Sequence, residues 1–248
     1  MKSERQLVYG MRPVLELLER RRAEVERILV ARERRAGVGH LLRLAREGGV
    51  PVSHLERQAL ASQAGARALH QGIAAVVAPL AYEDPDRVSA RCAPGRGLLV
   101  LVDRVMDPRN LGAILRTCAG AAVDGVLLAG GGGVGLTPVV LKAAAGAADR
   151  VPVAREPHPA SRLERLRAEG FVALALDPRG GSEWHRADLR GPTVLVAGSE
   201  GRGIRPGILR ACDGRLAIRL APGLGSLNVA VALGVVLFEA VRQRGAGP

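Results

Sequence analysis

Short apolar runs alternate with helix-like segments from residue 98 onward, and this alternation restricts the possible folds more than any other feature. Short, nearly continuous apolar runs separated by helices are typical of a parallel sheet covered on both faces. The sequence therefore predicts an α/β domain over residues 98–248, whose last helix lies at 225–240. The six runs are LLVLVD (98–103), GVLLAG (125–130), VPVAR (151–155), FVALALD (171–177), PTVLVAG (192–198) and GRLAIRL (214–220).

Residues 1–80 form a second, smaller region. Apolar spacing over 10–25 predicts an amphipathic helix, and the order of the later segments predicts a small α/β module. Strands are expected at 25–31, 50–55 and 72–80, and helices at 38–49, closed by Gly48-Gly49, and at 56–64. The polar residues 81–97 contain two prolines and are expected to form a linker, with a short helix as one option.

Charge and cysteine content restrict the partners. The chain of 248 residues has a net charge of +12, which favours a polyanion such as nucleic acid, although an arginine-rich solvated surface has the same composition. Cys92, Cys118 and Cys212 have no metal-binding spacing. We therefore expect no metal site and no disulfide framework, which fits the cytoplasm.

No membrane segment is expected. The first ten residues, MKSERQLVYG, lack the apolar core of a signal peptide. Residues 220–238 carry no charge, but Pro222, Gly223 and Gly225 interrupt their first half. The continuous apolar part is about half of the ~20 residues that cross a bilayer, so it is predicted to be a buried helix.

Three strand ends are unusually polar or rich in glycine, and in open α/β sheets such ends bind ligands. They are VDRVMDPRNLGAILRTC (102–118), LVAGSEGRGIRP (195–206) and LAIRLAPGLGSLNVAVA (216–232). In this order and spacing they closely resemble the three motifs of the SpoU family of RNA ribose 2'-O-methyltransferases, the TrmH-type enzymes. VYGMRPVLELLE and HQGIAAVV resemble the family's N-terminal RNA-binding module. The whole chain is most similar to the branch that methylates a guanosine of 23S rRNA.

The resemblance implies a fold, a cofactor and a partner. The fold would be SPOUT-type: a parallel-sheet catalytic domain over 98–248 with a deep trefoil knot, joined to an L30e-like RNA-binding domain over 1–80. S-adenosylmethionine would lie in the knot, and the active form would be a homodimer with its sites at the interface. Sequence rules alone predict an unknotted sheet, because threaded chains are rare.

The resemblance also implies the site residues. Asn110, Arg116, Glu200, Ser226 and Asn228 match the catalytic positions. The cofactor-binding positions are matched by Gly198, Gly201, Ile218 and Leu227. Each also has a structural explanation: a helix cap or surface ion pair for the polar residues, and an ordinary turn for the glycines.

The chemistry suggests how Arg116 acts. A guanidinium group stays protonated in proteins, so it is a poor base for the ribose hydroxyl. We expect Arg116 to clamp a phosphate with two hydrogen bonds and to stabilise the developing alkoxide. The proton would then leave to a phosphate oxygen or to water.

The chain departs from the family pattern near the third motif. Arg219 and Leu220 stand where Pro and Met are common, Pro222 where glycine is usual, and Ala230 where serine is frequent. The Ser226-Leu227-Asn228 core is intact, so binding of the methyl donor is expected to survive.

Three alternatives remain open. A tRNA methyltransferase of the same family would carry the same motifs. The loop GGGGVG, with Gly130, Gly132 and Gly135 after a strand and Asp149 further on, partly matches a nicotinamide-dinucleotide fingerprint and suggests an oxidoreductase. A non-enzymatic RNA-binding protein would need only the N-terminal module.

Overall fold

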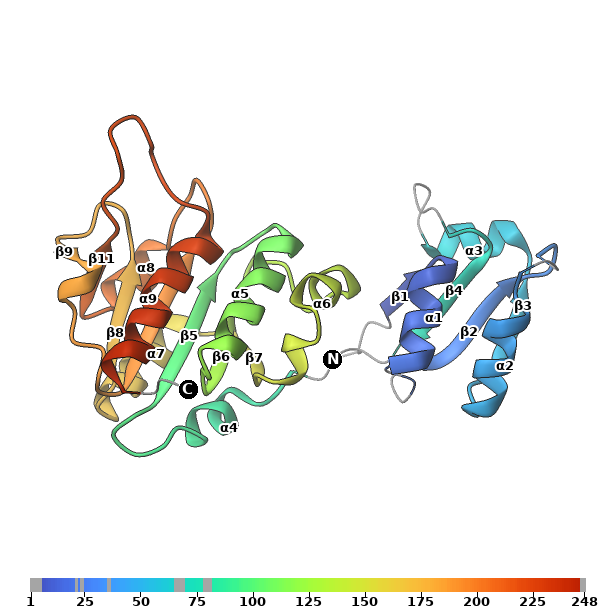
Figure 1. The fold of residues 1–248 in the computed structure, drawn as a ribbon, viewed down its shortest axis with the longest axis horizontal. Coiled ribbons are helices and arrows are strands. Elements are labelled where there is room, and N and C mark those ends of the chain that lie inside the picture. The colour runs from blue at the N-terminus through green and yellow to red at the C-terminus, as the bar shows by residue number, and fades with distance from the viewer. Residues whose placement is uncertain are drawn as a thin grey trace. The chain divides into compact units, whose positions relative to one another are not determined.

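The computed structural model describes residues 6–20, 22, 25–34, 37–64, 70–77 and 82–245. It divides the chain into two compact units, Met1–Ala81 and Tyr82–Pro248, which are described separately (Figure 1). Both units combine helices with a β-sheet. The predicted α/β class is therefore confirmed.

The first unit is a four-stranded sheet in the order β1-β4-β2-β3, in which β2 and β3 are parallel and the other pairs antiparallel. Helices α1 and α2 pack on one face and α3 on the other. The elements are β1 (Gln6–Tyr9), α1 (Met11–Arg20), β2 (Val25–Ala31), α2 (Gly39–Glu47), β3 (Val52–Leu55), α3 (Arg57–Ala64) and β4 (Ile73–Val77).

The four-residue strand β1 was missed by the sequence prediction. The predicted end of α2 is confirmed: Gly48 follows the helix and Gly49 has a φ of +66°, which favours glycine. Parts of two predictions, residues 78–80 of the last strand and 21, 23 and 24 of the first helix, lie outside the described residues.

The second unit contains a seven-stranded sheet in the order β7-β6-β5-β10-β8-β11-β9, and every neighbouring pair is parallel. All six predicted strands are present, although β11 is shorter than expected. The two-residue strand β9 was not predicted. The strands are β5 (Leu98–Asp103), β6 (Gly125–Ala129), β7 (Val153–Glu156), β8 (Val172–Leu176), β9 (Ser182–Glu183), β10 (Thr193–Gly198) and β11 (Gly214–Ala217).

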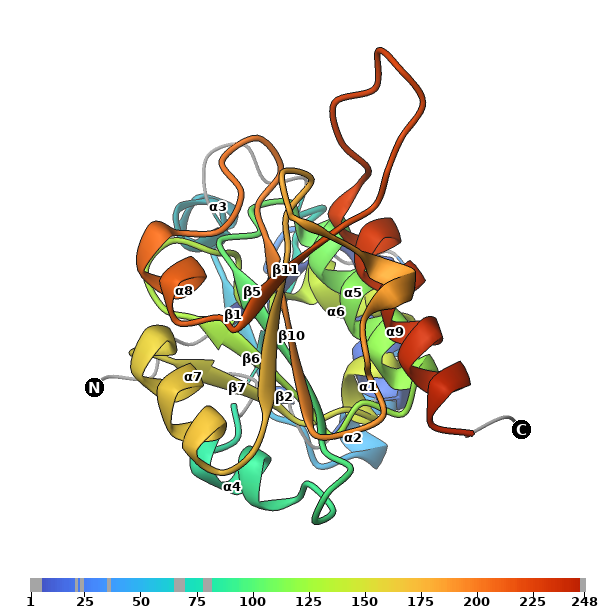
Figure 2. The same ribbon diagram turned by 90° about the vertical axis from the view of Figure 1, so that its left-hand side faces the viewer.

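Helices cover both faces of this sheet, as predicted (Figure 2). One face carries α5 (Pro108–Gly120), α6 (Pro138–Ala144) and α9 (Val229–Gln243). The opposite face carries α4 (Pro85–Ala90), α7 (Pro159–Ala168) and α8 (Pro206–Arg210), whose apolar side chains share one buried cluster with the sheet. Among the described residues, no helix is long and apolar enough to span a membrane.

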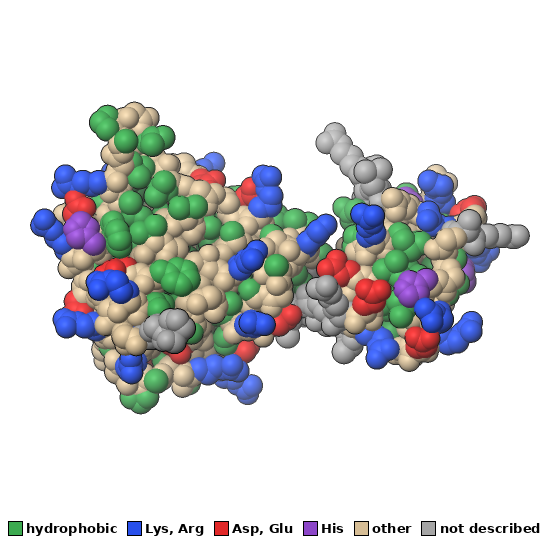
Figure 3. All heavy atoms as spheres, in the orientation of Figure 1, with side chains coloured by type: hydrophobic (Ala, Val, Ile, Leu, Met, Phe, Trp, Pro, Cys, Tyr) green, Lys and Arg blue, Asp and Glu red, His purple; other side chains and the backbone are tan. Residues whose placement is uncertain are grey.

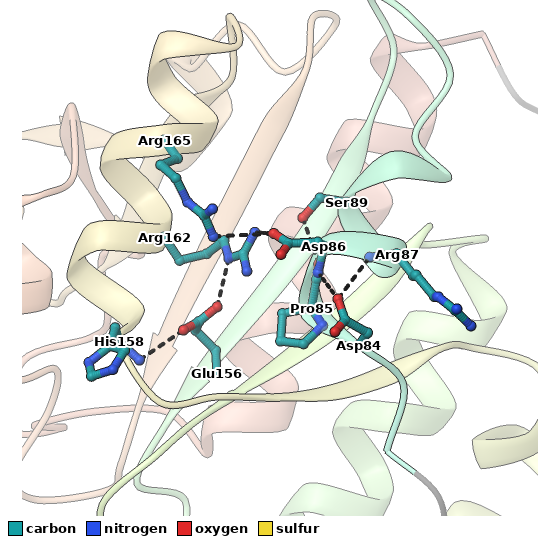
Figure 4. Close-up of polar contacts among 9 residues, drawn as sticks. All are labelled: Asp84, Pro85, Asp86, Arg87, Ser89, Glu156, His158, Arg162 and Arg165. Carbon is teal, nitrogen blue, oxygen red and sulfur yellow. Dashed lines mark hydrogen bonds and ion pairs between the residues drawn. The ribbon is translucent and has the colours of Figure 1, made fainter.

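Residues 82–97 pack on the second unit. Glu83 forms a β-bridge with Ala154, and Asp84 caps α4, the short helix within this segment. Asp86 of α4 accepts hydrogen bonds from Arg162 and Arg165 of α7, at 2.5 and 3.2 Å (Figure 4). Arg162 also donates to the buried Glu156 at 2.6 Å. These ion pairs therefore hold α4, near the start of the second unit, against α7 and β7.

Candidate active site

The three motif-bearing strands end at the same edge of the sheet. Strands β5 and β10 are neighbours, and their last residues, Asp103 and Gly198, are paired in register. Strand β11 lies two positions from β10 and ends at Ala217, so Ile218 comes directly after the strand. Because all three strands are parallel, the loops that follow them meet at one edge, where open α/β sheets bind ligands.

A cluster of one carboxylate and two amides lies at this edge. Asn110 Nδ2 donates to Glu200 Oε1 at 2.8 Å. Asn228 Nδ2 donates to the same oxygen at 3.0 Å and to Asn110 Oδ1 at 2.9 Å. Three predicted residues that are far apart in the sequence are therefore in mutual contact.

Helix ends position the two amides. Asp107, not Asn110, is the N-cap of α5; its carboxylate accepts from the Arg109 backbone N–H, and Pro108 follows as the first helical residue. The Arg109 side chain also donates to this carboxylate and lowers the pKa of Asp107. Asn110 therefore lies in the first turn, with its side chain available for the cluster.

Asn228 both caps a helix and joins the cluster. Its Oδ1 accepts from the Ala230 N–H at 2.9 Å, which caps α9, while its Nδ2 donates to the cluster. The predicted helix at 225–240 begins later than expected, at Val229, because residues 225–228 belong to the loop. Asn228 can therefore be both the cap of the helix and a member of the polar cluster.

A tight turn presents Glu200. Ser199 and Gly203 exchange backbone hydrogen bonds of 3.3 and 2.9 Å, and Gly201 has a φ of +83°, which favours glycine. A Cβ on Gly198 would lie 2.5 Å from the Gly203 carbonyl carbon. Glycine at 198 therefore permits the close approach that turns Glu200 toward the cluster.

Two adjoining cavities flank Glu200. The first, of about 480 Å³, is lined by all four predicted cofactor residues, Gly198, Gly201, Ile218 and Leu227, and also by Ser226. The second, of about 550 Å³, is lined by Asn110 and by arginines 104 and 202. Glu200 lines both cavities, so this carboxylate lies where their contents would meet.

Sequence reasoning missed several cavity residues. Asp177 is buried and lines the first cavity, directly after β8. The position of Asp177 directly after an apolar run of the sequence could have identified it as a site residue. Arg104, which lines the second cavity, directly follows β5 and could have been found in the same way.

Arg116 lies apart from the cluster. It is an exposed residue of α5 and is absent from the residues that line the two cavities in the described part of this chain. Seven of the nine predicted site residues therefore line the two cavities, and Asn228 joins them through its hydrogen bonds to Asn110 and Glu200. Arg116 remains outside them.

The departures in the third motif have local explanations. The Arg219 side chain forms an ion pair with Glu183 of β9. Pro222 is exposed in the loop before α9, and Ala230 is buried in the first turn of that helix. None of these three side chains lines the first cavity as described, whereas Leu220, the fourth departure, does.

The glycine-rich loop differs from a dinucleotide site. The loop follows β6, but α6 begins only at Pro138, and Thr137 caps the N-terminus of that helix. Asp149 lies in the 3-10 helix Ala147–Asp149 rather than at the end of a strand. No cluster of three metal-binding side chains occurs among the residues with described positions.

Adjoining cavities at the strand ends of a parallel sheet, around a carboxylate–amide cluster, are typical of a ligand-binding α/β protein with an open sheet. The sequence pattern of the SpoU rRNA Methylase family matches residues 97–238, and that of RNA 2'-O ribose methyltransferase substrate binding matches residues 7–83. The chain belongs to the SpoU rRNA methylase family, and it is an RNA methyltransferase. Family membership decides against the oxidoreductase and the non-enzymatic alternatives.

Relatives match almost the whole chain. A protein of Mycolicibacterium smegmatis described as an uncharacterized tRNA/rRNA methyltransferase is 38% identical over 98% of this chain and 78% of its own length. The 23S rRNA (guanosine-2'-O-)-methyltransferase RlmB of Pseudomonas putida is 35% identical over 98% of both chains. The crystal structure of the SpoU methyltransferase AviRb from Streptomyces viridochromogenes in complex with AdoMet has a TM-score of 0.71 and 28% identity, covering 98% of this chain and 92% of that one.

Proposed function

We propose that this chain transfers a methyl group from S-adenosylmethionine to the ribose 2'-hydroxyl of a guanosine in 23S rRNA. The observation that carries this proposal is the contact of Asn110, Glu200 and Asn228 between two cavities. The full-length match to RlmB supports the choice of rRNA and of guanosine.

The first cavity suits S-adenosylmethionine. Leu176, Ile204 and Leu216 give it apolar walls for an adenine ring, and the nearby carboxylate of Asp177 can accept hydrogen bonds from hydroxyl or amino groups. Gly198 and Gly201 leave room for the backbone to approach a ligand. When bound, the cofactor supplies a methyl group on a positively charged sulfur.

The chain's own residues bind and orient the sugar in the second cavity. Glu200 is the acceptor for both amides of the cluster, so each amide is held in one orientation. Fixing the reacting groups in line should supply most of the rate. The hydroxyl proton leaves to a phosphate oxygen or water, because the arginines of the site stay protonated.

The active form in this proposal is a homodimer. Arg116 is exposed and outside both cavities as described, so a second copy would bring its Arg116 to the site as the phosphate clamp. Val231 and Phe238 of α9 are large exposed apolar residues, and hydrophobic side chains gather on the face of the second unit that includes α9 (Figure 3). Such a face is suited to association.

Further parts of the proposal follow the family resemblance. The first unit binds the RNA substrate, which agrees with the substrate-binding pattern over residues 7–83. The second unit is knotted around its third motif, and the enzyme works in the cytoplasm.

A tRNA target is the second candidate, because the Mycolicibacterium relative is described as a tRNA/rRNA methyltransferase. Ribose-methylation mapping of total RNA from a deletion strain separates the two. Loss of one 2'-O-methylguanosine in 23S rRNA is expected. Loss confined to tRNA would replace the rRNA assignment with the tRNA one.

A further inference from the structure

Arg104 has an unusual backbone conformation beside the active site. It directly follows β5 and has a φ of +55°, in the left-handed region that favours glycine. Non-glycine residues in this region are uncommon, and strained backbone concentrates at functional sites. The backbone conformation of Arg104 is therefore a reason to expect a functional role for its side chain.

The charge of Arg104 is only partly compensated. Asp103 is fully buried, and its carboxylate accepts from the Arg205 side chain at 2.8 Å and from the Arg205 backbone N–H at 2.7 Å. Arg104 Nε is 3.8 Å from the same carboxylate, beyond hydrogen-bond distance. One carboxylate thus faces two guanidinium groups, and a positive charge remains.

One nitrogen of the Arg104 guanidinium also has no hydrogen bond to the described residues. Its Nε is buried, and it has no hydrogen-bond partner among the described residues, although the side chain as a whole is 24% exposed. Nearby Asp107 is already paired with Arg109 at 2.9 Å. Arg104 is therefore a cation of the second cavity whose charge and hydrogen-bonding capacity are not fully used within the described residues.

The glycine-rich loop lies against Arg104. The Val134 N–H donates to the Val105 carbonyl at 2.9 Å, and a Cβ on Gly133 would lie 3.3 Å from the Arg104 Cα. Gly131 and Gly132 line the second cavity together with Arg104, Asn110 and Glu200. The loop thus places backbone without side chains beside the Arg104 cation and next to the cluster that contains Asn110 and Glu200.

We propose that Arg104 and the loop Gly131–Gly133 bind a phosphodiester of the RNA beside the target ribose. The proposal rests on the RNA methyltransferase function argued above. A guanidinium group binds phosphate oxygens with two hydrogen bonds, and glycines let a phosphate approach the backbone closely. Such contacts fix the register of the nucleic acid without reading its sequence.

The test compares variants that carry the same net charge. Arg104→Gly removes the cation and places glycine where the backbone favours it, so the fold should be preserved. Arg87→Gln removes an exposed arginine of α4, which lies near the opposite edge of the sheet (Figure 2). Binding of a 20-nucleotide single-stranded RNA is measured by fluorescence anisotropy over a range of potassium chloride concentrations.

For Arg104→Gly, the slope of log affinity against log salt should become shallower by about 0.7, the value for one lost contact with single-stranded RNA. The affinity at low salt should fall about tenfold. Arg104→Lys should keep the wild-type slope, and so should Arg87→Gln. An unchanged slope in Arg104→Gly, or the same change in Arg87→Gln, would overturn the subsite.

Two further measurements separate this subsite from other roles. The S-adenosylmethionine affinity of Arg104→Gly should match the wild type; a weaker affinity with an unchanged slope would assign Arg104 to the cofactor site instead. Methyl transfer by the wild type to a 23S rRNA transcript tests the proposed function alone. Salt-dependent phosphate binding is independent of RNA sequence. The phosphate subsite can therefore fail its test while methyl transfer to 23S rRNA is observed, and the reverse also holds.

Discussion

Glu200 is the central residue of the site at the scale of single side chains. One of its oxygens accepts from two amides, one in α5 and one at the N-cap of α9. A carboxylate can accept several such bonds, whereas a neutral amide side chain has one oxygen and one NH₂ group. The cluster therefore depends on the charge of this residue as well as on its shape.

Replacing Glu200 with Gln should lower kcat/KM for RNA by about 10- to 100-fold, because charge-assisted hydrogen bonds are lost and an NH₂ group can face another donor. Methyl-transfer kinetics measure this effect. Glu200 is exposed, so the melting temperature should stay close to that of the wild type. A rate within twofold of the wild type would remove the residue from the catalytic cluster.

Arg116→Lys tests the phosphate clamp. Lysine keeps the charge but lacks the planar fork that forms two parallel hydrogen bonds. The expected result is a loss of about tenfold or more in kcat/KM for RNA, with unchanged affinity for S-adenosylmethionine. A near-normal rate in this variant would rule out the bidentate role.

At the scale of elements, close packing between α5 and α6 positions Asn110. A Cβ on Gly112 of α5 would lie 2.4 Å from the Ala143 Cβ and 2.8 Å from the Val140 carbonyl oxygen. Backbone atoms cannot move aside as a flexible side chain can. The glycine therefore sets the distance between the helix that carries Asn110 and its neighbour.

Gly112→Ala should destabilise the protein by about 1–3 kcal/mol, the usual cost of overpacking, and should also lower activity. Gly120→Ala is the matched control in the same helix, because its Cβ would meet only the Phe238 ring at 3.7 Å. Urea unfolding of both variants measures the difference. Equal stabilities would show that the α5–α6 contact adapts freely.

The ion pairs of α4 and α7 predict a dependence of stability on pH. The hydrogen bond from Arg162 and its charge hold the pKa of Asp86 below the ordinary value of 3.8. A lowered folded-state pKa stabilises the protein fully above the unfolded value, and this contribution is lost as the pH falls through the folded value. Asp86 should therefore raise the melting temperature above about pH 4, and this contribution should disappear in stronger acid.

Asp86→Asn should lower the melting temperature near neutral pH, and its difference from the wild type should shrink below about pH 4. Glu164→Gln, at an exposed carboxylate of α7 outside the cluster drawn in Figure 4, is the control. A difference that stays constant down to about pH 2 would contradict the assignment.

The sequence was most informative where local patterns are strong. Six apolar runs predicted six parallel strands; the two-residue β9 was missed because two residues carry no period, and the four-residue β1 was also missed. A helix cap was the structural explanation considered for the polar site residues such as Asn110, but the N-cap of α5 is Asp107, three residues earlier. The left-handed backbone of Arg104 could not be foreseen, because a positive φ is uncommon for a residue other than glycine and nothing in the local sequence indicates it.

Spacing alone did not predict the cluster of Asn110, Glu200 and Asn228. Their convergence was an expectation of the family resemblance, and the order of the strands in the sheet provides its physical basis. The sequence reveals which residues end each strand. Sheet order depends on contacts between distant segments, which a single sequence does not display.

At the scale of the whole molecule, the proposed homodimer predicts complementation between inactive subunits. Arg116→Ala and Asn228→Ala should each be inactive alone. If Arg116 acts in the site of the partner subunit, a mixed dimer contains one intact site, and co-refolding equal amounts should restore about one quarter of the wild-type activity. No recovery in mixtures that form dimers would place Arg116 in its own subunit's site.

The central claim is that three distant loops direct a methyl group to an RNA sugar. The most direct measurement is nucleoside mass spectrometry of a 23S rRNA transcript after incubation with the purified chain and isotope-labelled S-adenosylmethionine. The account predicts the label in 2'-O-methylguanosine at one position, and its loss in Glu200→Gln. Label on a base, or none on the RNA, would contradict it.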